Sequence, residues 1–123
     1  MSLQEPILVL GHGAYWDRIG GRCSPIPVKL WNSQPHVTVD VDPTVEPTIL
    51  ADLKKYPWSF AKETSFATIV DTAGCCFTSR RSGQTYPHSF LKEVARLLMP
   101  NGVFYGRTGT WKKQPSFDMT QSS

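Results

Sequence analysis

Short apolar segments that close on a glycine or an aspartate recur along this chain and limit the folds open to it. The run 6–10 is continuously apolar and ends at Gly11, which fits a central strand of a parallel sheet. Further strands are predicted over 36–42, 48–51 and 65–71, each ending in or just before an aspartate. Several short strands of this kind indicate an open α/β sheet.

One stretch has a clear helical pattern. Apolar residues at 90, 91, 94, 97 and 98 predict a helix over 89–99, with Ser89 as its N-cap. The turn Pro100-Asn101-Gly102 is expected to stop it, and a fifth strand follows over 103–106. The proline- and glycine-rich interval 14–35 is interpreted as a loop.

Size and charge narrow the function classes. A chain of 123 residues suits one domain, and a net charge of +3 does not indicate a nucleic-acid partner. No apolar run approaches the roughly 18 residues of a membrane span, and no secretory signal is visible, so a cytoplasmic protein without membrane association is expected. The three cysteines and three histidines lack metal-binding spacing, so no metal site is predicted.

The polar residues of interest lie at the predicted strand ends, where open α/β sheets bind ligands. Gly11 and Gly13 follow the first strand, although such a pair is also common in turns. A carboxylate at Asp40 could accept hydrogen bonds from vicinal ribose hydroxyls. Asp42 precedes a proline and fits a turn, and Asp52 could bind an exocyclic amine or cap a helix.

Four pieces of the chain, in order, resemble a class I S-adenosylmethionine-dependent methyltransferase. They are Val39-Asp-Val-Asp-Pro43, Pro47-Thr-Ile-Leu-Ala-Asp-Leu53, Phe66-Ala-Thr-Ile-Val-Asp71, and the helix 90–99 with its Met-Pro-Asn-Gly turn and following strand. The last is the most specific, and 7–13 stands where the family has its glycine motif. The resemblance implies a Rossmann-like, mostly parallel five-stranded sheet of order 3-2-1-4-5, with S-adenosylmethionine as cofactor. It implies cofactor contacts from Gly11, Gly13, Asp40, Val41, Asp52, Leu53, Asp71 and Thr72.

The chain also departs from the family. Val9 replaces the usual acid before the glycine motif, and the helix expected between the first two strands is missing. The family's sixth and seventh strands are expected to be absent, which leaves a minimal cofactor-binding domain over 1–106 and a C-terminal tail over 107–123. The fifth strand would then be an exposed edge, so a homodimer or a partner protein is expected to pair with it.

The catalytic residues are not identified. Cys75, Cys76 and His88 are weak candidates for chemistry, Arg80-Arg81 for an acidic substrate, and Trp58 for covering the cofactor or for core packing. Three functions stay open: a methyltransferase of unidentified acceptor, a non-catalytic module that acts by regulating a partner, and a small nucleotide- or NAD-binding protein. Trp16 stands where the dinucleotide fingerprint has its third glycine, which disfavours the last.

Overall fold

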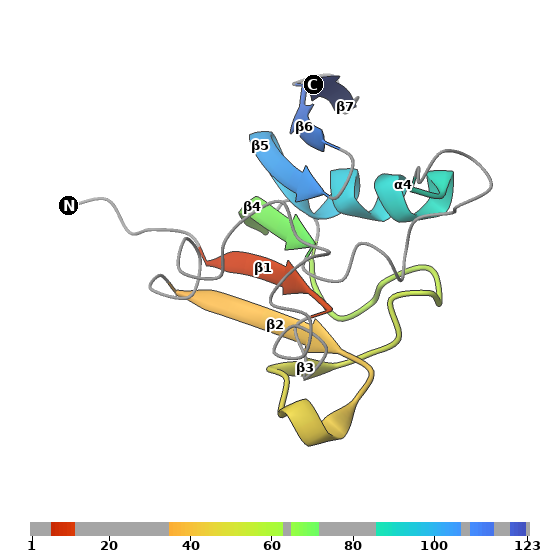
Figure 1. Cartoon of the computed structure of the whole chain (residues 1–123). Helices are drawn as coiled ribbons and strands as arrows, with labels where there is room; N and C mark the ends of the chain where they lie inside the picture. The colour runs from red at the N-terminus through yellow and green to blue at the C-terminus, as the bar shows by residue number, and fades with distance from the viewer. Residues whose placement is uncertain are drawn as a thin grey trace.

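The structure is a computed structural model that describes residues 6–11, 35–62, 65–71, 86–106, 109–114 and 119–122. These residues form a mixed α/β fold around a seven-stranded, mostly parallel sheet of order β3-β2-β1-β4-β5-β6-β7 (Figure 1). The strands are β1 (Ile7–Leu10), β2 (His36–Asp40), β3 (Ile49–Leu50), β4 (Phe66–Asp71), β5 (Leu98–Gly106), β6 (Gly109–Lys113) and β7 (Met119–Ser122). A 3-10 turn, η1 (Pro43–Val45), follows β2, and the helix α4 (His88–Leu97) precedes β5.

The first five strands are parallel and follow the predicted order. β1 lies between β2 and β4, with Leu10 opposite both Val39 and Asp71. β3 continues the sheet beyond β2, where Leu50 pairs with Asp40. The prediction of a 3-2-1-4-5 arrangement is therefore confirmed for this part of the sheet.

The prediction that the sheet stops at the fifth strand is wrong. β6 pairs antiparallel with β5, and β7 pairs antiparallel with β6, so residues 109–113 and 119–122 belong to the sheet and are not a tail. The free β5 edge on which a partner was expected is covered by the chain's own β6. The inward positions of β6 are Trp111 and Lys113, and a buried lysine hides the alternation that would have marked this strand.

Lys113 is only 1% exposed, and its Nζ donates a 2.7 Å hydrogen bond to the carbonyl oxygen of Leu98. Leu98 is the residue that caps the C-terminus of α4. A cation at this end of a helix interacts favourably with the helix dipole, which helps to offset the cost of its burial. β6 is thus attached both to β5 and to the end of α4.

The boundaries of α4 also differ from the prediction. The helix begins at His88 after an extended Pro87, and Ser89 is not its N-cap. It ends at Leu97, because Leu98 already pairs with Phe66 in the sheet. Pro100 has no N–H to extend the helix, and Asn101, at φ 66°, lies in an irregular part of β5 instead of in a separate helix stop.

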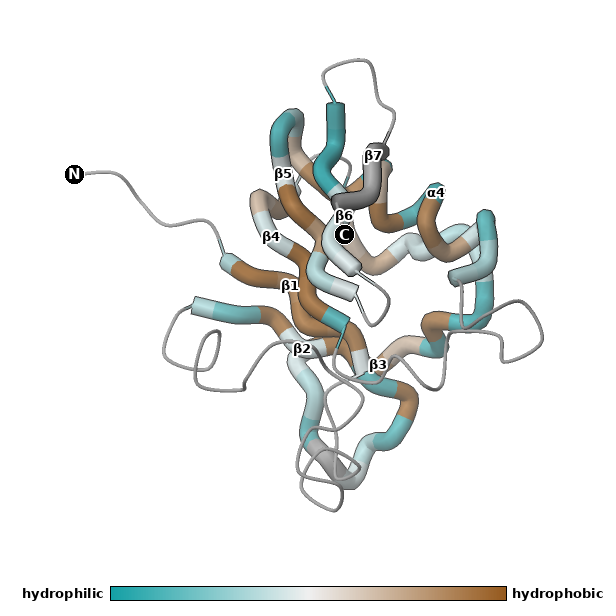
Figure 2. Tube along the Cα trace, turned by 45° about the horizontal axis from the view of Figure 1, so that its top comes forward, coloured by the Kyte–Doolittle hydropathy of each residue, from teal (hydrophilic) through white to brown (hydrophobic). Residues whose placement is uncertain are grey.

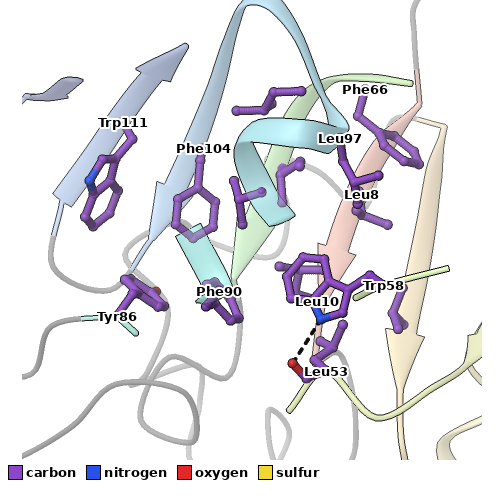
Figure 3. Close-up of a cluster of buried hydrophobic side chains, with 14 residues drawn as sticks. Leu8, Leu10, Leu53, Trp58, Phe66, Tyr86, Phe90, Leu97, Phe104 and Trp111 are labelled. Carbon is purple, nitrogen blue, oxygen red and sulfur yellow. Dashed lines mark hydrogen bonds between the residues drawn. The ribbon is translucent and has the colours of Figure 1, made fainter. Parts of the chain in front are cut away.

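The core is divided between the two faces of the sheet. On the face that α4 covers, Leu8, Leu10, Val39, Ile69 and Phe104 are fully buried. Aromatic side chains from α4, from β6 and from the segments that precede β4 and α4 join them there (Figure 3). The opposite face has a smaller buried group: Ile7, Val9 and Val70. Figure 2 shows the apolar residues concentrated along the central strands.

Candidate functional site

The parallel register brings the ends of four strands to one place. We use "carboxyl edge" for Gly11, Asp40–Val41, Leu50–Leu53 and Asp71. Leu10 lies opposite both Val39 and Asp71, and Asp40 lies opposite Leu50. Neighbouring strands lie about 4.8 Å apart, so these residues form one continuous rim. The rim includes the β1–β4 junction, where the strand order reverses and open α/β sheets bind ligands.

Gly11 makes the turn out of β1. Its φ of 75° lies in the left-handed region that favours glycine, and its N–H donates a 2.8 Å hydrogen bond to the carbonyl oxygen of Val39. The predicted turn glycine is thus placed beside the end of β2. Gly13, the other predicted member of this motif, lies outside the described residues.

Asp40 is the last residue of β2 and is half-buried. Its Oδ1 accepts a 2.9 Å hydrogen bond from the backbone N–H of Asp42. A carboxylate can accept several hydrogen bonds, so Asp40 keeps further acceptor capacity. Val41 follows and is 63% exposed, which leaves an apolar side chain next to this carboxylate.

Asp42 serves the turn, as its Asp-Pro sequence indicates. Its Oδ1 accepts hydrogen bonds from the N–H of Thr44 at 2.9 Å and from the Thr44 hydroxyl at 2.7 Å. These bonds cap η1. Two aspartates that stand two residues apart therefore have different tasks in the same loop.

Asp52 reaches the carboxyl edge from β3. The N–H of Ala51 donates a 3.0 Å hydrogen bond to the carbonyl oxygen of Asp40, which places Asp52 immediately beyond the β2 end. Its Oδ1 accepts a hydrogen bond from the N–H of Lys54, so this aspartate stabilises a turn and does not cap an α-helix. Leu53 is 3% exposed and belongs to the core on the α4 side.

Asp71 occupies a different environment. It is fully buried at the end of β4, and its Oδ2 accepts a 2.5 Å hydrogen bond from the hydroxyl of Tyr86. The Tyr86 ring stacks on Phe90 with 4.8 Å between centroids, so the pair is built into the aromatic core. Thr72 lies outside the described residues, and cofactor contacts from Asp71 and Thr72 stay predictions.

Tyr56 lies in the segment after Asp52, and its phenol is 40% exposed. Partial burial raises the pKa of this phenol, and the carboxylates of Glu93 and Asp52 raise it further. A raised pKa in the folded state favours the neutral phenol there. Its contribution to stability is complete below the ordinary tyrosine pKa of about 10 and is lost as pH rises through the folded-state value.

We therefore expect Tyr56→Phe to reduce the loss of stability above about pH 10. Urea unfolding of both proteins between pH 8 and 11 measures this, because the difference in their unfolding free energies should narrow or reverse with rising pH. Tyr105→Phe, which removes a hydroxyl from a half-buried position on β5, is the control. A constant difference between wild type and Tyr56→Phe across this range would contradict the assignment.

The remaining candidates are distributed unevenly. His88 is exposed at the first position of α4, and Trp58 is 2% exposed in the core, which confirms the packing interpretation. The pairs Cys75-Cys76 and Arg80-Arg81 lie outside the described residues. Over the described ranges, no group of His, Cys, Asp and Glu is arranged to hold a metal ion, and no helix could span a membrane.

Two features of this region were not predicted from the sequence. One is the Tyr86–Asp71 pair, whose members are 15 residues apart, and the other is the ion pair of Glu93 and Arg96 beneath the Asp52 segment. A buried glutamate on the apolar side of a helix is a usable signal for such a contact, because a charge is rarely buried without a partner. Comparison with protein-family models, curated proteins and solved structures gives no match to this chain.

Proposed function

We propose that this chain has a Rossmann-like cofactor domain and binds S-adenosylmethionine at the carboxyl edge. Two kinds of support meet there. The strand order β3-β2-β1-β4-β5 creates a reversal point at the β1–β4 junction. The sequence pieces that resemble the methyltransferase family end at the same rim of the sheet.

The observation that carries the proposal is the placement of Asp40 beside Gly11. The N–H of Gly11 is bonded to Val39, the residue before Asp40, so a ligand that passes over the glycine turn meets this carboxylate. Asp40 has acceptor capacity for two ribose hydroxyls beyond its bond to Asp42. The exposed Val41 offers an apolar surface for the nucleobase.

Methyl transfer is the activity we propose for the bound cofactor. The reaction is an in-line displacement at an activated sulfonium, and positioning the acceptor can supply much of the rate acceleration. A cofactor-binding module without catalysis is the second candidate. The burial of Asp71 supports it, because the residue expected beside the methionine part of the cofactor is engaged by Tyr86.

The test is calorimetric titration of the folded protein with S-adenosylmethionine, S-adenosylhomocysteine and NAD. We expect one site per chain with micromolar affinity for the first two ligands and weaker binding of NAD. Asp40→Asn should weaken binding by about tenfold to a hundredfold, because hydrogen bonds to a charged acceptor contribute about 1.5–3 kcal/mol each. Asp42→Asn, the same chemical change two residues away, should leave the affinity within about twofold because Asp42 serves the turn.

The outcomes separate the candidates. Binding that Asp40→Asn does not weaken would remove the proposed site, and absence of binding by the folded wild type would remove the cofactor assignment. Formation of S-adenosylhomocysteine in the presence of candidate acceptors would favour the enzyme. Tight binding without turnover across nucleic-acid, protein and small-molecule acceptors would favour the module.

A further inference from the structure

The segment that carries Asp52 and Leu53 has little regular structure of its own. Residues 51–62, between β3 and β4, contain turns and bends but neither a helix nor a strand. A loop of this kind holds a binding side chain accurately only if another element fixes it. The contacts that fix this loop come from α4.

Trp58 is held on both sides of its backbone. Its N–H donates a 2.7 Å hydrogen bond to Oε1 of Glu93, and its carbonyl oxygen accepts one from the guanidinium of Arg96. Glu93 and Arg96 are one turn apart on α4 and form an ion pair at 3.0 Å. We refer to Glu93, Arg96 and Trp58 as the clamp.

The Trp58 side chain carries the constraint back toward the carboxyl edge. Its indole Nε1–H donates a 3.0 Å hydrogen bond to the carbonyl oxygen of Leu53, the residue next to Asp52 (Figure 3). The indole is 2% exposed and meets Phe90 edge-on, with 5.2 Å between ring centroids. A buried indole with its N–H satisfied and its ring packed has little freedom to move.

We propose that Trp58 is a positioning residue: held by Glu93 and Arg96, it fixes the Asp52–Leu53 corner in the orientation needed to recognise the exocyclic amine of a bound nucleobase. This inference rests on the proposed function. It adds that selectivity for an amino-substituted base depends on α4, whose residues lie on the covered face of the sheet and touch no part of the rim. Discrimination by a polar contact requires accurate placement of the acceptor, whereas apolar contact with the base tolerates small shifts.

The experiment compares affinity for S-adenosylhomocysteine with affinity for its inosine analogue, in which an oxygen replaces the amine. We expect the wild type to prefer the amine by about tenfold, the size of one hydrogen bond to a charged acceptor. Trp58→Phe keeps an aromatic ring but removes the indole N–H, and should lower this preference to about twofold or less. Both affinities should converge, instead of falling in parallel, because the apolar contacts persist.

Variants of Glu93 test the backbone half of the clamp. Glu93→Ala removes the acceptor for the Trp58 N–H and should also abolish most of the preference. Glu93→Gln keeps an oxygen that can accept this hydrogen bond, so it should restore at least about half of the preference. Leu91→Ala shortens a half-buried side chain of the same helix that contacts none of the clamp hydrogen bonds, and controls for a general loss of stability.

Each outcome has a separate meaning. A wild type that binds neither ligand overturns the proposed function and this inference together. A wild type that binds both equally, or variants Trp58→Phe and Glu93→Ala that fold and keep the preference, overturn this inference alone. A matching loss of preference in Leu91→Ala would also overturn it, since the effect would then follow from stability and not from the clamp.

Discussion

Replacing Phe90 with alanine should lower the free energy of unfolding by about 3–5 kcal/mol. Phe90 is fully buried on α4 and is surrounded by other rings. It stacks on Tyr86 at 4.8 Å, meets Trp58 edge-on at 5.2 Å and lies 6.1 Å from Phe104. The truncation removes both the burial of the ring and these aromatic contacts, and leaves a cavity that three rigid neighbours cannot fill.

Urea unfolding followed by circular dichroism measures this loss. Ser89→Ala, an exposed neighbour on the same helix, should change stability by less than about 0.5 kcal/mol. Because the expected loss approaches the whole stability of a small domain, Phe90→Leu provides a milder variant that should lose about 1–2 kcal/mol. A loss below about 1 kcal/mol for Phe90→Ala would mean that this ring is not at the centre of the core.

Gly106→Ala should destabilise the fold by about 2–3 kcal/mol, although it adds only one methyl group. A Cβ at Gly106 would lie 2.8 Å from carbon atoms of both Trp111 and Tyr86, and 2.9 Å from Phe104. Ring atoms packed against one another cannot move aside separately. The glycine is needed because three aromatic side chains converge on the end of β5.

A double-mutant cycle tests that explanation. Trp111→Leu removes one of the rings that crowd the new methyl group. If crowding is the cause, the loss in the double variant should be smaller than the sum of the two single losses by about 1 kcal/mol or more. Additive losses would point to the backbone of β5 and not to the rings. Gly106→Ala with stability within about 0.5 kcal/mol of wild type would contradict the packing around this residue.

The parallel part of the sheet was predictable because its strands announce themselves. Continuous apolar runs such as 7–10, closed by Gly11 or an aspartate, identify β1, β2 and β4, and their order followed from the family resemblance. The end of α4 was not predictable from helical periodicity, because the apolar stripe continues through Leu98, which the sheet recruits instead.

β6 was missed because its inward face holds one tryptophan and one lysine. The charge of Lys113 is compensated by the carbonyl oxygen of Leu98, a contact that exists only after α4 and β6 have come together. Sequence patterns describe a side chain by its type and cannot include a partner that the fold supplies. The prediction of a partner at the β5 edge followed from this omission.

The candidate site was predicted with similar limits. Gly11, Asp40 and Asp52 were expected at neighbouring strand ends, and the register places them there. Leu53 and Asp71 were placed in the same group, but both are buried on the α4 side. Position at a strand end fixes the height of a residue along the sheet, whereas the pleat decides which face its side chain takes.

The two kinds of strand pairing in this sheet also differ in the order in which they can form. β1 pairs with β4 across 61 residues of sequence, from Ile7 to Thr68, whereas β5 and β6 join partners as close as Gly106 and Gly109. Hairpins close in microseconds, but distant parallel pairing must first overcome the entropy of a long loop. The local unit of α4, β5 and β6, already tied together by Lys113, is therefore suited to act as the folding nucleus. The carboxyl edge would be completed last, when β1 enters between β2 and β4.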